Sequence, residues 1–371
     1  MLRLLDGVLR DMIESEKLKQ GGGGGMTADE IRIRQMANQH LLDRTNMLTA
    51  VRDLCGVQAQ FMSHAVHALR IRTDDFDEEA ITQRLVKGWT VRGTMHLLAP
   101  DDLPLFICAK HYRSNDWHEP SFWNQRSCWA LTPERQAYFT QVILDALAGG
   151  PQTREALKAC CREHGMTDAE EGSMFDPWGG GVREMCERGF MHGLAQEEKS
   201  YCLTPAFMPV EEATAQLELM RRYFTHFGPA TIRDAAYFFG MPQRRVKQLL
   251  NELPVVSALC GGRTYFWLEQ GLPYNEAVPD CVFLAGFDQL MLGYDKRESL
   301  YLPPEHVSRV FSRSGIVFPT VLLHGRTAGT WKQKDSRIRI MPFAPLTVAD
   351  RAAIMTAARQ LWGETVQPEI L

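Results

Sequence analysis

The feature of this sequence that most restricts its fold is one order of elements that occurs three times. In each occurrence, apolar residues at helical spacing are followed by two short strand-like stretches with a break between them. The strand pairs are expected at 89–92 with 95–98, at 190–193 with 200–203, and at 255–259 with 263–268. The sequence therefore predicts three groups of helices, each followed by a two-stranded hairpin.

Helical runs precede every strand pair and complete the pattern. They are expected at 29–41, 47–54, 62–71 and 78–86 before the first pair, at 133–147, 152–164 and 178–188 before the second, and at 211–226, 231–238 and 243–253 before the third. Three helices and a two-stranded wing are the order of a winged helix, so we expect three winged helices in tandem. The three segments share little sequence, and the repeat is one of architecture.

After residue 276 the sequence changes character, because short strand-like stretches are broken there by Gly and Pro. These stretches are 282–284, 289–292, 316–318, 321–323, 329–331 and 338–341. Several short strands in a small region favour a barrel or a compact sheet, and a helix over 348–361, capped by Thr347, closes the chain. The predicted fold is α+β, with winged helices at 26–130, 131–209 and 210–275 and a small β-barrel with its closing helix at 276–371.

Residues 1–25 end in five consecutive glycines followed by Met26, which is the composition of a flexible coil. Two explanations are open: a linker, or a start codon assigned too early. Either way, we expect this extension to lie outside the fold.

Composition excludes several classes of protein. The 41 Lys and Arg residues against 45 Asp and Glu give a net charge of −4, so any affinity for nucleic acid must come from local patches. No stretch approaches the roughly 18 uninterrupted apolar residues that suggest a membrane span. The nine cysteines include no CxxC pair, which argues against a zinc site or a disulfide framework. We expect a cytoplasmic monomer that binds neither a metal nor a cofactor.

Two local groups of basic residues stand out from this acidic background. One contains Arg309, Arg313, Arg326, Lys332, Lys334, Arg337 and Arg339 against the single acid Asp335. The other contains Arg244, Arg245 and Lys247 on the helix that would enter a DNA groove in a winged helix. A phosphate backbone suits both groups, but each is equally compatible with an ordinary solvated face.

Three sets of residues are candidates for chemistry or recognition. Gln58 and Gln60 project to the same side of an extended backbone and could hold one water there, although such a pair is common by chance. His64 and His67 lack a third metal ligand at supporting spacing, so surface or groove histidines are favoured. An aromatic segment favours core packing over base stacking; it comprises Tyr112, Trp117, Phe122, Trp123 and Trp129.

Several motifs in order carry a resemblance to a known family. They are GVQAQ at 56–60, RGTMHL at 92–97, GFDQLMLGYDKR at 286–297, FPTVLLHGR at 318–326 and GTW at 329–331. Over residues 28–362 the chain resembles the AlkZ-like winged-helix DNA glycosylase family. The resemblance implies tandem winged helices and a C-terminal β-barrel around duplex DNA, and excision of N-alkylated purines, including bulky adducts and interstrand crosslinks. Gln58 and Gln60 match the paired-glutamine motif that would position the attacking water, whereas Phe61 departs from the small or acidic residue expected there.

We therefore expect a monofunctional DNA repair glycosylase acting on double-stranded DNA that contains alkylated purines, without a membrane partner. The expected DNA contacts are Arg92, Thr94 and His96 in the first wing, Arg244, Arg245 and Lys247 in the third unit, and Arg326, Lys332 and Lys334 near the last hairpin. The alternative is a non-catalytic winged-helix protein, either a regulator or a lesion binder. Because glutamine does not titrate, the enzyme's rate should vary little between pH 6 and 8.

Overall fold

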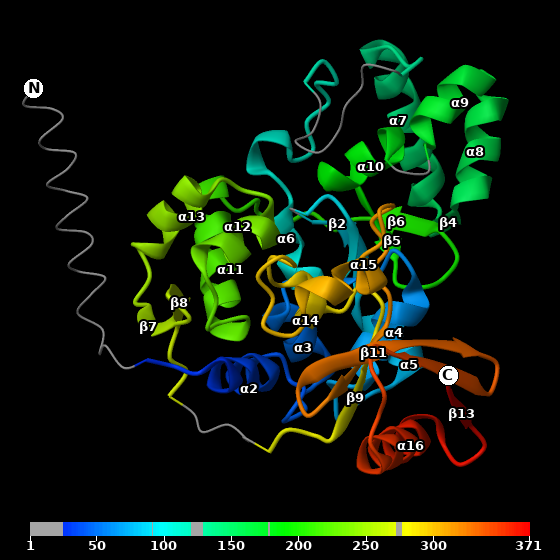
Figure 1. Ribbon diagram of the computed structural model, residues 1–371. Coiled ribbons are helices and arrows are strands. Elements are labelled where there is room, and N and C mark those ends of the chain that lie inside the picture. Colours follow the sequence, from blue (N-terminus) through cyan, green and yellow to red (C-terminus); the bar gives the residue numbers. More distant parts are fainter. Residues whose placement is uncertain (1–24, 91, 120–128, 177–178, 272–276) are drawn as a thin grey trace, which may run out of the picture. The chain divides into compact units, whose positions relative to one another are not determined.

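The computed structural model describes residues 25–90, 92–119, 129–176, 179–271 and 277–371 (Figure 1). The described chain forms two compact units. One unit spans residues 46–219, and the other combines the residues up to 45 with residues 220–371. The expectation for the N-terminal extension falls on residues 1–24, outside the described ranges. Among the described residues, no helix has the length and apolar character that crossing a membrane requires.

The unit of residues 46–219 contains the first two predicted groups of helices. The first group is α3 (Met47–Asp53), α4 (Met62–Arg70) and α5 (Glu78–Arg84), followed by 3-10 helix η1 (Pro100–Asp102), α6 (Leu103–Phe106) and 3-10 helix η2 (Ala109–His111). The second is α7 (Pro133–Ala148), α8 (Arg154–Glu163), α9 (Asp168–Met174) and α10 (Gly180–Glu187). Polar residues before five of these helices accept hydrogen bonds from the first helical turn, which explains where the helices begin; they are Asn46, Asp77, Thr132, Thr153 and Thr167.

The two hairpins of this unit belong to one six-stranded sheet, in the order β1-β3-β2-β5-β6-β4. Its strands are β1 (Val57–Gln58), β2 (Val86–Trp89), β3 (Met95–Leu98), β4 (Gln152–Thr153), β5 (Met191–Leu194) and β6 (Ser200–Leu203). The hairpins join where Val86 pairs with Leu194 and Lys87 with Gly193. The predicted strand at 89–92 is therefore displaced to begin at Val86, and Arg92 to Thr94 lie in the turn, which Gly93 makes possible with a φ of 69°.

Trp117 is almost completely buried and belongs to the core around α7 and α10. The interpretation of this residue as core packing is therefore confirmed, and base stacking by it is excluded. Phe122 and Trp123 lie outside the described residues.

The third group of helices is α11 (Glu212–His226), in which the boundary between the units falls at residue 219, and then α12 (Ile232–Phe239) and α13 (Gln243–Leu250) in the other unit. A separate two-stranded sheet follows, β7 (Val256–Cys260) and β8 (Arg263–Trp267). Helix α2 (Ala28–Asn38) is tied to this segment by side-chain amides, because Gln35 donates to the carbonyl of Pro229 at 2.6 Å and Asn38 to that of Gly228 at 2.8 Å. Helix α2 thus packs with the third group of helices.

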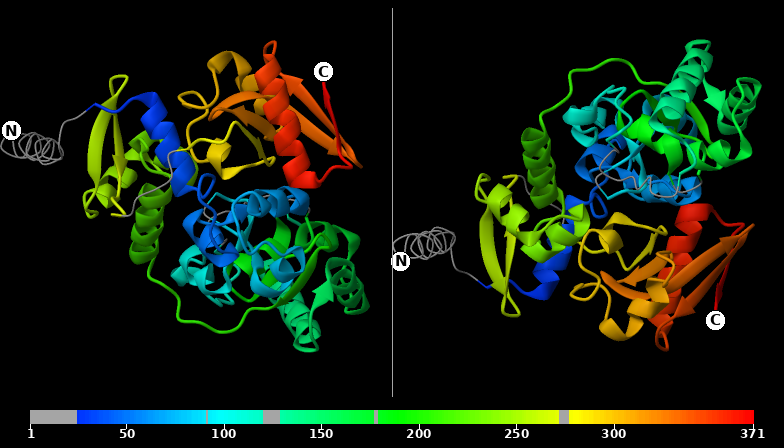
Figure 2. Two further views of the ribbon diagram at one scale, coloured as in Figure 1. Left: turned by 90° about the horizontal axis from the view of Figure 1, so that it is seen from below. Right: turned by 90° about the horizontal axis from the view of Figure 1, so that it is seen from above.

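The C-terminal segment forms an open five-stranded sheet in the order β13-β12-β11-β10-β9, and the expected closed barrel is not found in the described residues. The strands are β9 (Cys281–Leu284), β10 (Thr320–Leu323), β11 (Arg326–Lys334), β12 (Arg337–Pro342) and β13 (Gln367–Ile370). Helix α16 (Val348–Trp362) lies along one face of this sheet (Figure 2). Its Ile354 and Ala358 pack against Phe283, Trp331 and Ile338, so the helix covers the apolar face that a barrel would enclose.

A second prediction for this segment was also wrong. The stretch Gln289–Leu292, expected as a strand, is the short helix α14, because the side chain of Asp288 accepts a hydrogen bond from the amide of Leu290 at 2.9 Å and caps it. The stretch 316–318 is not a strand and makes only a single bridge, between Val317 and Phe311. The remaining elements are the 3-10 helix η3 (Pro304–His306) and α15 (Val307–Val310).

Candidate active site and DNA interface

The paired-glutamine motif begins at a turn that only glycine fits. Gly56 has a φ of 91°, and a Cβ there would lie 2.7 Å from the side chain of Leu98 and 3.2 Å from that of His96. The chain then enters β1, where Gln58 pairs with His96 of β3, and the amide of Ala59 donates to the carbonyl of Met95 at 2.8 Å. Gln58 is buried and Gln60 is exposed at the end of this pairing. The backbone is thus extended through Val57 and Gln58, and the strand ends before Gln60.

His96 is fully buried, with 0% of its surface exposed. Its Nδ1 lies 2.9 Å from the carbonyl oxygen of Thr94, which can only accept, so Nδ1 carries the proton. Its Nε2 then accepts a hydrogen bond from the guanidinium of Arg92. Burial, and next the charge of Arg92, hold the pKa of His96 well below its ordinary value.

These contacts correct one expectation for the first wing. The side chain of His96 is inaccessible to DNA and instead holds Arg92 and the carbonyl of Thr94. Arg92 and Thr94 are half-buried in the turn. No local pattern predicts this burial, because His96 lies near the end of a short strand, where an exposed side chain is expected.

Helix α4 begins directly after the motif and carries the two histidines. Phe61 precedes its first residue and is 43% exposed, and its ring lies 6.0 Å from that of His64 in an edge-to-face arrangement. Burial lowers the pKa of His64, and His67 is buried in the helix's inner face. Among the described residues, no third metal-ligating side chain joins the two histidines.

The predicted basic residues of the third group of helices lie on α13. Arg244 and Lys247 are exposed and Arg245 is half-buried, while Val246 and Leu249 face the core. The helix therefore presents its cations on the side opposite its apolar contacts.

The hairpin of β11 and β12 concentrates charge more strongly. Lys332 pairs with Arg339 and Lys334 with Arg337 across the two strands, and all four side chains are exposed. Directly paired residues share one face of a sheet, so the four cations form one group, which we call the cationic hairpin face. Arg339 is paired with Glu369 at 3.0 Å, whereas within the described ranges no carboxylate lies within ion-pair distance of the other three.

Arg326, expected as a DNA contact, starts β11 and forms an ion pair with Asp29 at 3.0 Å. It thereby links the sheet to the first turn of α2. Because both side chains are largely exposed, this pair adds little to stability and can be exchanged for another anion.

The sequence shows which protein family the chain belongs to. The model of the AlkZ-like DNA glycosylase family matches residues 51–362. The chain belongs to the AlkZ-like DNA glycosylase family. It is therefore a DNA glycosylase, and the resemblance drawn from the motifs is confirmed.

This glycosylase is similar to a known relative in sequence and to a solved structure in fold. An interstrand DNA cross-link repair glycosylase of Streptomyces sahachiroi is 28% identical over 335 residues, which cover 83% of this chain and 88% of the relative. The solved structure of the DNA glycosylase AlkZ from Streptomyces sahachiroi has a TM-score of 0.75 at 22% identity, covering 94% of this chain and 100% of that chain. The structural likeness shows that the two share a fold.

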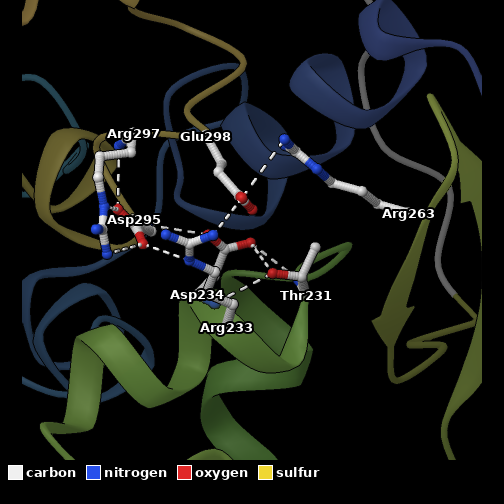
Figure 3. Close-up of polar contacts among 7 residues, drawn as sticks. All are labelled: Thr231, Arg233, Asp234, Arg263, Asp295, Arg297 and Glu298. Atoms are coloured by element: carbon white, nitrogen blue, oxygen red, sulfur yellow. Dashed lines mark hydrogen bonds and ion pairs between the residues drawn. The ribbon is translucent and has the colours of Figure 1, made fainter.

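The motif at 286–297 of this AlkZ-like glycosylase is anchored by a charge network that sequence reasoning missed (Figure 3). The carboxylate of Asp295 forms ion pairs with Arg233 of α12 at 2.7 Å and with Arg297 at 3.2 Å. Arg233 also forms an ion pair with Glu298. The amide of Asp295 donates to Asp234, a buried carboxylate that caps α12 together with Thr231. Burial raises the pKa of Asp234. Burial alone would raise that of Asp295, but hydrogen bonds from Arg297 and Arg233 hold it below its usual value.

This network fixes the loop after α14 to α12. The motif therefore has a structural explanation in this chain: it holds the C-terminal segment against the third group of helices. The helical pattern of α12 marks Arg233 as a surface residue, and only the fold brings it to Asp295.

Proposed function

We propose that this DNA glycosylase hydrolyses the N-glycosidic bond of N-alkylated purines in duplex DNA, including bulky adducts and interstrand crosslinks, as a monomer without a cofactor. The observation that carries the proposal is the placement of Gln58 on β1, held against β3, with Gln60 exposed at the end of the pairing. The name of the Streptomyces sahachiroi relative, an interstrand DNA cross-link repair glycosylase, supports the crosslink as one substrate.

The chemistry suits side chains that do not titrate. Alkylation at N7 gives the purine a positive charge, which weakens its bond to the sugar before the enzyme acts. The two amides hold one water against the sugar carbon, supplying proximity and orientation. The water oxygen bonds to that carbon, the electron pair of the broken bond goes to the purine and neutralises it, and the water's spare proton leaves to solvent.

Arg92 is the group that we assign to the DNA phosphate nearest this site. His96, opposite Gln58 in the sheet, holds the guanidinium from behind through a neutral ring nitrogen. The neutral ring adds no competing positive charge beside the guanidinium of Arg92, and a charged donor makes a strong hydrogen bond to a phosphate oxygen. Thr94 shares the turn with Arg92 and would contact the same backbone.

The remaining DNA contacts follow the proposed division into three winged helices and a C-terminal sheet domain. Arg244, Arg245 and Lys247 would contact DNA from α13, the third helix of the third winged helix. Lys332, Lys334 and Arg326 would do so from β11. Like charges paired across strands repel one another, so the cationic hairpin face suits an anionic partner.

Base release by the wild-type enzyme tests this function. We expect release from duplexes carrying N7-methylguanine and unhooking of an N7-linked interstrand crosslink, measured under single-turnover conditions on denaturing gels. Duplex binding with no release from either substrate would contradict the proposal and favour the non-catalytic alternative. A stable dimer with a preferred DNA sequence would point to a regulator.

The rate of base release should change by less than about twofold between pH 6 and 8, because no group at the site gains or loses charge there. Burial lowers the pKa of His64 and, together with the charge of Arg92, that of His96, so both shifts favour neutral rings beside the glutamines. The measurement is the single-turnover rate against pH at constant ionic strength. A tenfold change per pH unit within this range would instead indicate a titrating base.

Neutralising the cationic hairpin face should weaken DNA binding and its salt dependence together. The Lys332→Gln/Lys334→Gln/Arg337→Gln variant removes three charges, so the slope of log K against log salt should become shallower by up to about 2.7. Fluorescence anisotropy with an undamaged duplex at several salt concentrations measures it. Arg351→Gln, an exposed cation on α16, is the control, and an unchanged slope in the triple variant would remove this face from the interface.

A further inference from the structure

Phe61 is an exposed aromatic residue directly beside the catalytic pair. Its side chain is 43% exposed, and it follows the exposed Gln60. The next residue, Met62, is buried and anchors the start of α4. An apolar ring that remains in water forfeits much of the free energy that its burial would give, so folding does not account for a phenylalanine here.

The position of Phe61 in the helix strengthens this point. It is the residue directly before α4, where Ser, Thr, Asp and Asn are preferred because their side chains accept a backbone hydrogen bond. Phe61 makes no such bond. Nine other helices in the described ranges have a Thr, Asp or Asn cap that does; these caps are Thr27, Asn46, Asp77, Thr132, Thr153, Thr167, Thr231, Asp288 and Thr347. Phe61 therefore leaves α4 without a stabilising cap, and its exposed ring also forfeits free energy of burial.

A neighbouring ring fixes the orientation of Phe61. His64 lies one turn along α4, with ring centroids 6.0 Å apart and ring planes inclined by 73°. This edge-to-face geometry is favourable for two aromatic rings. Burial lowers the pKa of His64, so its ring is neutral at neutral pH and adds no charge beside the site. The exposed part of Phe61 is thus a preset apolar surface next to Gln60.

We propose that Phe61 is a specificity-determining residue whose ring stacks on a planar aromatic group beside the scissile bond. That group is either an aromatic part of a bulky adduct or a nucleobase next to the lesion, since both offer the same flat π surface. The inference rests on the proposed function, because it takes Gln58 and Gln60 as the site of hydrolysis. It adds the substrate class that the enzyme would prefer: alkylated purines with a planar aromatic surface nearby.

Three lesions of graded shape test the inference. They are N7-methylguanine, N7-benzylguanine and N7-(cyclohexylmethyl)guanine in the same duplex, the last two matched in size but not in planarity. Stacking on an aromatic side chain changes affinity by about 5- to 150-fold. We expect Phe61→Leu to lower kcat/KM by a factor in this range, and Phe61→Trp to retain wild-type rates. Tyr138→Leu removes another exposed aromatic residue of the same unit, 46% exposed on α7, and should change nothing.

The pattern across the lesions identifies the stacking partner. A loss confined to N7-benzylguanine assigns the ring to the adduct, and an equal loss on all three lesions assigns it to a neighbouring base. Phe61→Leu rates equal to wild type on every lesion overturn the inference while leaving the glycosylase intact. Absence of release by the wild type would instead overturn the proposed function.

A second variant separates recognition from folding. Phe61→Thr restores a polar cap to α4, which should raise the Tm by about 2–4 °C while lowering release as Phe61→Leu does. A lower Tm in this variant would show that Phe61 serves the fold, and would overturn the inference.

Discussion

Replacing both Gln58 and Gln60 by alanine should reduce base release by about a hundredfold or more while duplex binding stays within about twofold of wild type. Correct placement of a reactant can lower a barrier by up to about 7–11 kcal/mol, and losing about 3 kcal/mol of this already slows the reaction a hundredfold. Neither glutamine carries charge, so the phosphate contacts that dominate affinity are untouched. The measurement combines single-turnover release from N7-methylguanine duplex with anisotropy binding.

The single variants show whether the two amides act as a unit. If they hold one water, each single alanine should cost nearly as much as the pair, because groups that act together are not additive. Gln83→Ala, an exposed glutamine on α5, controls for general effects of the substitution. The thermal midpoint of Gln58→Ala must stay near wild type, since Gln58 is buried. Release within about threefold of wild type in a folded double variant would place the attacking water elsewhere.

The helices of this glycosylase were largely predictable because their signals are local. Apolar spacing located α3, α4, α7, α11 and α16, and Thr347 was identified as the cap of α16. The same reasoning failed at Gln289–Leu292, where four residues are too few to separate a strand from a helix by periodicity. The cap at Asp288 was the signal that could have decided it.

Features that depend on distant segments could not be predicted. The pairing of Val86 with Leu194 joins two hairpins more than a hundred residues apart, and nothing local in either strand requires it. The open sheet also differs from the expected barrel because α16 covers one of its faces, which is a property of packing rather than of strand count. The same holds for His96, whose burial depends on the pairing of β3 with both β1 and β2.

The candidate site shows a similar division. Sequence alone pointed to Gln58 and Gln60, and the structure places Gln58 on β1 and Gln60 two residues beyond it. The sequence did not reveal that His96 holds the guanidinium of Arg92. That contact depends on the geometry of the turn between β2 and β3, which brings the two side chains together. The sequence also marked Arg188 only as the end of a helical run, although that residue is among the most deeply buried charges in the chain.

Arg188 makes the strongest stability prediction, since Arg188→Met should lower the free energy of unfolding by about 3–5 kcal/mol. Arg188 and Glu184, one turn apart at the end of α10, are both 0% exposed and lie 3.2 Å apart. The guanidinium also donates to the carbonyls of Ser114 at 2.8 Å and Glu119 at 2.5 Å, and lies 4.3 Å from the centre of the Trp117 ring. Its loss would leave the Glu184 carboxylate buried without its countercharge and release the segment before residue 120.

Thermal unfolding and a double-mutant cycle measure this effect. At about 2–4 °C per kcal/mol, Arg188→Met should lower the Tm by about 6–20 °C. Adding Glu184→Gln removes the buried negative charge that Arg188→Met leaves without a countercharge. The amide oxygen of the new glutamine can still accept the hydrogen bond from Nε2 of Gln136, which lies 3.0 Å from Glu184. The double variant should therefore recover part of the lost free energy of unfolding. Arg162→Met, which breaks the more exposed pair with Glu171, should cost less than about 1 kcal/mol. A similar small cost for Arg188→Met would mean that neighbouring polar groups or water satisfy Glu184 without the arginine.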